Sequence, residues 1–190
     1  LLFFKNQKKY NKIIIAGHSE GSLIGMIAAN GKADAFISLA GAGRTIDTVL
    51  VEQIAKQAPY LKEEVQDNLN ILKSGKTFEL KNPMLASIFR ESVQPYMISW
   101  IKYNPQIEIA KLQMPVLIVN GTKDLQVAVH DAELLKKAKP EAELVLIENM
   151  NHIFKEIKGD DTENIQSYSN PDAPIAPKLT NPITVFIKAL

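Results

Sequence analysis

The stretch Lys12-Ile13-Ile14-Ile15-Ala16-Gly17-His18-Ser19-Glu20-Gly21 decides the fold, and Ser22-Leu23-Ile24-Gly25-Met26-Ile27-Ala28-Ala29 follows it directly. A β-branched strand here runs into a helix through a turn that carries glycine two positions before and two positions after a serine. Such a tight turn strains the backbone of its central residue, and we expect bulky side chains at either glycine to collide with the strand and the helix. The serine hydroxyl then projects near the positive end of the helix, where developing negative charge is stabilised. The pattern predicts a nucleophilic Ser19.

Two further strands are each followed by a side chain with acid–base chemistry. The apolar run from Pro115 to Val119 leads through a turn to Asp124, and the run from Glu143 to Glu148 leads through a turn to His152. Ligands of open α/β sheets bind at the carboxyl ends of parallel strands. We therefore expect Ser19, Asp124 and His152 to converge at one edge of a parallel sheet.

With a serine, an aspartate and a histidine in this order along the chain, the sequence resembles the α/β-hydrolase family. The resemblance implies an α/β fold in which a mostly parallel sheet is flanked by helices. It also implies that His152 is the general base, that Asp124 orients it, and that the backbone N–H of Glu20 is one oxyanion donor. Taken singly, Asp124 could be an ordinary turn aspartate and His152 a solvated histidine, but their joint occurrence with the serine turn favours the triad.

A serine at this turn restricts the reaction that the resemblance implies. Dehalogenase and epoxide-hydrolase relatives carry a carboxylate at the same place, so Ser19 argues against both and leaves acyl transfer. We expect a carboxylic ester hydrolase that acts on a small-molecule ester through an acyl-enzyme intermediate. A serine peptidase or thioesterase of the same fold, and a non-catalytic binding protein of that fold, are the alternatives.

The chain is expected to form a single domain over residues 1–190, with a helical insertion at residues 45–110. Apolar residues recur there at helical spacing, beginning with Ile46, Val49, Leu50 and Ile54. In the resembling family this position commonly holds a lid. Residues 159–181 are polar and rich in proline, which predicts a long loop before a final helix at 183–190.

The chain opens on the apolar residues Leu1-Leu2-Phe3-Phe4, which we interpret as the end of a helix. The family has further strands before the nucleophile strand, together with the loop that donates the second oxyanion N–H, and neither is found here. The resemblance therefore implies a partial fold that lacks its amino-terminal strands. The strand at residues 12–16 would then have an open edge, through which the chain could associate.

Composition excludes several classes of function. The 22 Lys and Arg residues against 21 Asp and Glu residues give a net charge of +1, so nothing indicates binding to nucleic acid or an anionic membrane. The local cluster Lys5, Lys8, Lys9 and Lys12 is interrupted by polar residues and is expected to be solvated. No apolar run approaches the roughly 20 residues needed to span a bilayer. The chain has no cysteine, no other side chains have convincing metal-ligand spacing, and the proposed triad needs no cofactor. The cellular compartment stays open.

Overall fold

A four-stranded parallel sheet organises one of the two units into which the chain divides. The structure is a computed structural model that describes residues 1–7 and 9–190, so Lys8 of the lysine cluster lies outside the described residues. The sheet belongs to the unit formed by Leu1–Gly43 and Pro105–Leu190, and the second unit is Arg44–Asn104. The strands are β1 (Ile14–His18), β2 (Ala35–Leu39), β3 (Val116–Gly121) and β4 (Glu143–Ile147), arranged in that order. All three pairings are parallel, as the sequence predicts.

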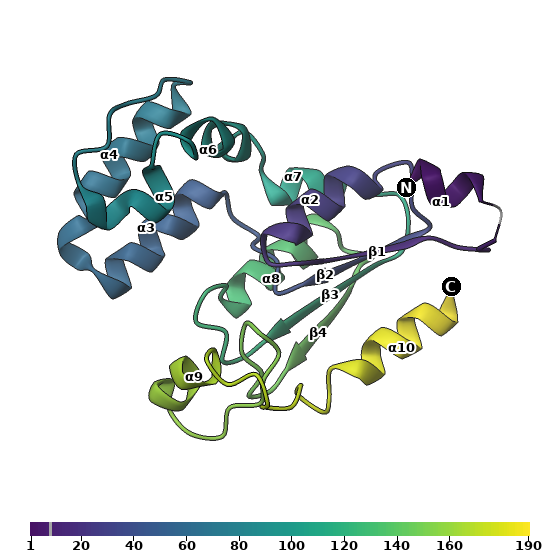
Figure 1. Cartoon of the computed structure of the whole chain (residues 1–190). Helices are drawn as coiled ribbons and strands as arrows, with labels where there is room; N and C mark the ends of the chain where they lie inside the picture. Colours follow the sequence, from purple (N-terminus) through teal and green to yellow (C-terminus); the bar gives the residue numbers. More distant parts are fainter. Residues whose placement is uncertain (8) are drawn as a thin grey trace. The chain divides into compact units, whose positions relative to one another are not determined.

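Helices cover both faces of this sheet. Parallel strands in sequence order, joined by right-handed crossovers, place their connecting helices on one face. These are α2 (Glu20–Ala29), α7 (Pro105–Ala110) and α8 (Val129–Ala138), and α7 packs against both of the others. The helix α10 (Thr180–Ala189) lies along the sheet apart from them and covers the opposite face (Figure 1). The short α1 (Leu2–Asn6) precedes β1.

The core under α10 follows the alternation of side chains along each strand. Successive residues of a strand point to opposite faces, so Ala35 and Ile37 of β2 face α10 while Phe36 and Ser38 face α2. On the α10 side, the buried residues are Ala35, Ile37, Leu117, Val119, Ile147, Met150, Ala176, Leu179 and Phe186. This apolar layer anchors the carboxyl-terminal segment to the strands whose ends carry the candidate site residues.

On the other face, Gly25 allows α2 to approach the sheet closely. A Cβ atom built on Gly25 would lie 2.7 Å from a ring carbon of Phe36 and 3.2 Å from a methyl carbon of Ile15. Phe36 is fully buried, so its ring has little room to move. The small residue is therefore required by packing, and the position of α2 sets where the serine turn stands above the sheet.

The segment after β4 is more ordered than the sequence predicts. Within the stretch expected to be a loop at 159–181, residues Asp161–Ser167 form α9. Its cap is Asp160, whose Oδ1 accepts hydrogen bonds from the backbone N–H groups of Thr162 at 3.0 Å and Glu163 at 3.2 Å. Two isolated antiparallel bridges, Met150 with Glu156 and Lys155 with Ile175, hold the rest of the segment. The prediction of a long loop was wrong for residues 161–167, because Asp160 caps a helix there.

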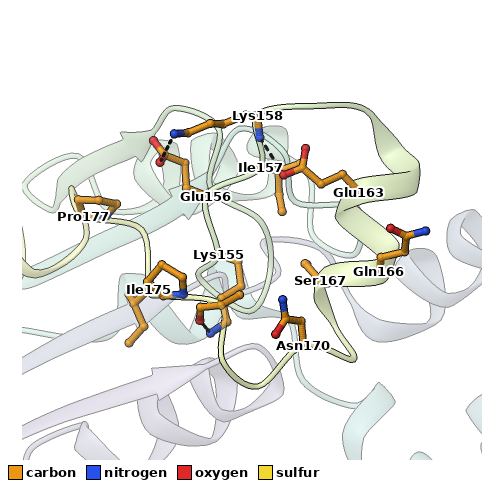
Figure 2. Close-up of a pocket in the computed structure, with 12 residues that line it drawn as sticks. Lys155, Glu156, Ile157, Lys158, Glu163, Gln166, Ser167, Asn170, Ile175 and Pro177 are labelled. Atoms are coloured by element: carbon orange, nitrogen blue, oxygen red, sulfur yellow. Dashed lines mark hydrogen bonds and ion pairs between the residues drawn. The ribbon is translucent and has the colours of Figure 1, made fainter.

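This segment encloses an open cavity of about 410 Å³ (Figure 2). Charged side chains that line it form hydrogen bonds with backbone groups of the same segment. Lys155 Nζ donates to the carbonyl of Ala173, and the Glu163 carboxylate accepts from the backbone N–H groups of Lys158 and Gly159. These bonds explain how a polar segment holds a defined shape.

The second unit is helical. It contains α3 (Ile46–Gln57), α4 (Lys62–Lys73), α5 (Ala86–Phe89) and α6 (Gln94–Ile101), with 3₁₀ turns at Pro59–Leu61 and Pro83–Leu85. Its core is largely apolar, and its buried polar side chains include Gln94, which is fully buried. The Gln94 amide accepts from Phe78 N and donates to the carbonyls of Phe78 and Phe89, at 2.7–2.9 Å. The unit ends at Asn104, six residues before the expected end of the insertion, because α7 packs against α2 and α8 instead.

In the described part of the chain, no helix combines the length and apolar character needed to cross a membrane.

The strand β1 lies at an edge of the sheet. It pairs with β2 on one side, and the described residues provide no strand on its other side. Ile14 and Ile15 are only half-buried, and Ala16 is exposed. Unpaired N–H and C=O groups along a partly apolar strand are a template for pairing with another chain.

We expect the isolated 190-residue polypeptide to self-associate through β1. Light scattering coupled to gel filtration should report species larger than 21.1 kDa. The variant Ala16→Lys should reduce their size, because a charge on an edge strand disfavours pairing. Ala110→Lys adds the same charge at an exposed position away from the edge and should leave the distribution unchanged. A monomer at all concentrations would contradict the prediction.

Candidate active site

Ser19 occupies a strained backbone conformation between β1 and α2. Its φ of 55° and ψ of −123° lie outside the conformations that residues with a side chain ordinarily adopt. Two backbone hydrogen bonds hold it there: Ser19 N donates to Leu39 O at 2.9 Å, and Ser22 N donates to Ser19 O at 3.0 Å. The turn thus presents a half-buried serine at the carboxyl end of β1 and the first turn of α2.

The two glycines of the turn have different roles. A Cβ atom built on Gly17 would overlap the carbonyl oxygen of Gly21, whereas a Cβ atom built on Gly21 meets nothing within 4 Å. The expectation that both positions are crowded is therefore correct for Gly17 and wrong for Gly21. The crowding arises because the helix begins immediately beside the strand that leads into it.

Asp124 is held rigidly by its own turn. Its Oδ1 accepts hydrogen bonds from the backbone N–H groups of Gln126 and Val127, both at 2.8 Å. Its Oδ2 lies 2.8 Å from Nδ1 of His152. Because a carboxylate only accepts, Nδ1 of His152 carries the hydrogen and donates it. The Asp124 side chain is 0% exposed and that of His152 is 4% exposed, so this pair is shielded from water.

His152 lies against the residue that precedes Ser19. The Nε2 atom of His18 donates to the backbone carbonyl of His152 at 2.8 Å, and the two ring centroids are 4.8 Å apart. With Nδ1 engaged by Asp124, a neutral His152 ring has Nε2 free to accept a proton. Among the described residues, neither Ser19 Oγ nor His152 Nε2 has a hydrogen-bond partner. The structure thus brings Asp124 and His152 into direct contact and joins His152 to the serine turn through His18.

The contact between His18 and His152 was not predicted from the sequence. Its ring also packs on Phe154, with 4.6 Å between centroids. Burial of the ring against these neighbours lowers the pKa of His18, and the hydrogen bond to the backbone of His152 offsets only part of that shift. His18 is therefore neutral at neutral pH, with its hydrogen on Nε2.

Glu20, the predicted oxyanion donor, is the first residue of α2. Its backbone N–H has no acceptor within the helix and lies at the positive end of the helix dipole. Burial raises the pKa of the half-buried Glu20 carboxyl group. This placement allows the Glu20 N–H to stabilise a negatively charged oxygen formed beside Ser19.

Other polar residues near the sheet have local partners. The N–H of Gly43, in the loop after β2, donates to Oδ1 of the buried Asp131 at 3.1 Å, which anchors that loop to α8. His130 is exposed and faces Glu133 at 3.6 Å. Over the residues that the structure describes, no group of three or more His, Asp or Glu side chains could hold a metal ion.

Comparison with solved structures identifies the fold. An esterase of Pyrococcus furiosus is similar over 99% of this chain, with a TM-score of 0.57 and 15% identity. A bromoperoxidase of Bacillus anthracis is similar over 97% of this chain, with a TM-score of 0.50 and 13% identity. The matched region covers 70% of the bromoperoxidase. The protein Est1E of Butyrivibrio proteoclasticus gives a TM-score of 0.49 over 88% of the chain, at 19% identity.

The chain has the α/β-hydrolase fold, as the sequence predicts. It spans 58% of the length of the Pyrococcus esterase and 63% of the length of Est1E. No protein-family profile matches the sequence, and no curated protein matches it.

The asymmetry of the serine turn is open to a direct test. Gly17→Ala should lower the free energy of unfolding by about 3 kcal/mol, because the added methyl group overlaps backbone that cannot move without breaking the turn. Gly21→Ala should change it by less than about 1 kcal/mol, since the added carbon has open space. Chemical denaturation of the two variants measures both values. Equal losses would contradict the geometry described for Gly17.

Proposed function

We propose that this chain carries the catalytic residues of a serine hydrolase that cleaves carboxylic esters. The observation that carries the proposal is the shielded hydrogen bond between Asp124 and His152, tied by His18 to the strained Ser19 turn. The fold supports a hydrolase in general, since the structural neighbours include the Pyrococcus furiosus esterase. The small-molecule ester substrate is part of the proposal.

In the first half of the proposed reaction, Ser19 Oγ attacks the acyl carbon of the ester while His152 Nε2 takes the hydroxyl proton. The hydrogen bond from Nδ1 to Asp124 orients the imidazole and stabilises the imidazolium that forms. The carbonyl oxygen becomes an oxyanion, and the Glu20 N–H donates to it at the positive end of α2. Collapse of the tetrahedral intermediate breaks the bond to the alcohol oxygen, which leaves with the proton from His152.

The second half uses the same residues on the acyl-enzyme. His152 takes a proton from water as the water oxygen attacks the acyl carbon, and a second oxyanion forms beside the Glu20 N–H. Its collapse releases the carboxylic acid and returns the proton to Ser19 Oγ. Each half therefore needs a neutral His152 whose Nε2 is free, which is the arrangement described above.

Replacement of the proposed nucleophile should abolish hydrolysis without unfolding the protein. In the native protein, Ser19→Ala should lower kcat for p-nitrophenyl esters by about six orders of magnitude and prevent labelling by a fluorophosphonate. Its Tm should change little, because the lost hydroxyl leaves no core cavity. Ser169→Ala, which changes an exposed serine, is the matched control and should keep both activities. An active Ser19→Ala variant would rule out covalent catalysis by this residue.

Replacement of the proposed acid tests the role of the Asp124–His152 bond. Asp124→Asn should lower kcat by up to about four orders of magnitude, because the amide can favour the wrong imidazole tautomer. Parallel assays with a thioester and a peptide amide separate the ester hydrolase from the thioesterase and peptidase alternatives. Wild-type protein that neither labels nor hydrolyses any of the three would support a non-catalytic binding role instead.

A further inference from the structure

One buried amide bridges the residues that precede the candidate acid and base. Asn164, on α9, is fully buried. Its Nδ2 donates to the backbone carbonyl of Lys123 at 2.7 Å, and its Oδ1 accepts from Asn151 Nδ2 at 3.0 Å. Lys123 directly precedes Asp124, and Asn151 directly precedes His152. A single side chain therefore links the two turns from outside both of them.

Asn151 in turn defines the shape of the histidine turn. Its Oδ1 accepts from the backbone N–H groups of Ile153 at 3.2 Å and Lys155 at 2.9 Å, on either side of the following bend. Its Nδ2 also donates to Ser167 Oγ at 2.8 Å, and Ser167 Oγ donates to the carbonyl of Asn164 at 2.7 Å. The turn that carries His152 is thus wrapped around an amide whose hydrogen bonds are all made within the protein.

The bridge requires both a donor and an acceptor on one planar group. Lys123 offers a carbonyl and Asn151 offers an N–H, so the bridging side chain must donate to the first and accept from the second. Asn and Gln carry both functions on one terminal group, and the length of Asn fits the measured distances. A buried network in which every group is satisfied holds one arrangement, whereas loss of one member leaves unpaired groups that drive rearrangement.

We propose that Asn164 is a positioning residue that sets the distance and angle between Asp124 and His152. This inference rests on the proposed hydrolase function. The backbone bond from Lys123 N to Met150 O at 3.0 Å, and the bond from Asn149 N to Thr122 Oγ1 at 2.8 Å, already hold the two turns near each other. Asn164 adds a direct link between Lys123 and Asn151, the residues that immediately precede Asp124 and His152.

The test compares two buried amides in the native protein. Asn164→Ala removes the bridge. Gln94→Ala removes a fully buried amide with three hydrogen bonds in the helical unit, which controls for a general loss of stability. Should Asn164→Ala fail to fold, Asn164→Ser fills more of the site, and its hydroxyl is too short to make both contacts. All assays run well below the Tm of the least stable variant.

We expect Asn164→Ala to lower kcat for p-nitrophenyl acetate by about 10²-fold with KM changed less than about twofold, because the base is misplaced while binding is kept. The rate of fluorophosphonate labelling should fall by a similar factor. The proton NMR signal of His152 Nδ1–H should move or broaden. Gln94→Ala should lower the Tm while leaving kcat and that signal as in the wild type.

A kcat for Asn164→Ala within twofold of the wild type would overturn the inference, as would an equal loss in Gln94→Ala. Wild-type protein without hydrolysis or labelling of Ser19 would refute the proposed function instead. The NMR comparison would then still decide whether Asn164 positions His152, because it needs no turnover.

Discussion

The close approach of β1 to α2 at Gly17 is the constraint on which the rest of the site depends. Because the helix begins beside the strand that leads into it, the residue between them must adopt a positive φ, and Ser19 does so. The backbone bond from Ser19 to Leu39 then ties this turn to the end of β2. The same approach places Ser19 directly before Glu20, the first residue of α2, whose backbone N–H has no acceptor within the helix. Packing of Gly25 against Phe36 holds α2 close to the sheet.

The parts of the site that could be predicted from the sequence are those governed by local chain chemistry. A β-branched run, a glycine-flanked serine and a helix predicted the turn, and apolar runs ending in Asp124 and His152 predicted their place at the strand ends. The hydrogen bond between those two side chains follows from the adjacency of β3 and β4. The predicted fold class is correct because each strand and each helix is formed by consecutive residues, whose pattern can be read locally.

What could not be predicted depends on contacts between distant parts of the chain. Nothing in the residues around Asn164 indicates that its amide contacts the turns of both Asp124 and His152. The stretch is polar and rich in proline, so it has no apolar periodicity that would mark Asn164 as buried. The partner of His18 lies 134 residues away. A Cβ atom at Gly21 would meet open space, and that space is defined only by the folded backbone. The apolar spacing of α7 is that of any helix, so only its packing against α2 and α8 associates it with the sheet.

The wide separation in sequence between His18 and His152 affects the order in which the protein folds. Asp124 and His152 are 28 residues apart and belong to one strand–helix–strand unit, so their loop closes at a small entropic cost. The serine turn joins them across 134 residues, a span that includes the whole helical unit. Contacts with such separation form slowly. The bond between Asp124 and His152 can therefore form early, while the Ser19 turn reaches the pair only when the sheet is complete, so a partly folded chain can hold the pair without the serine turn.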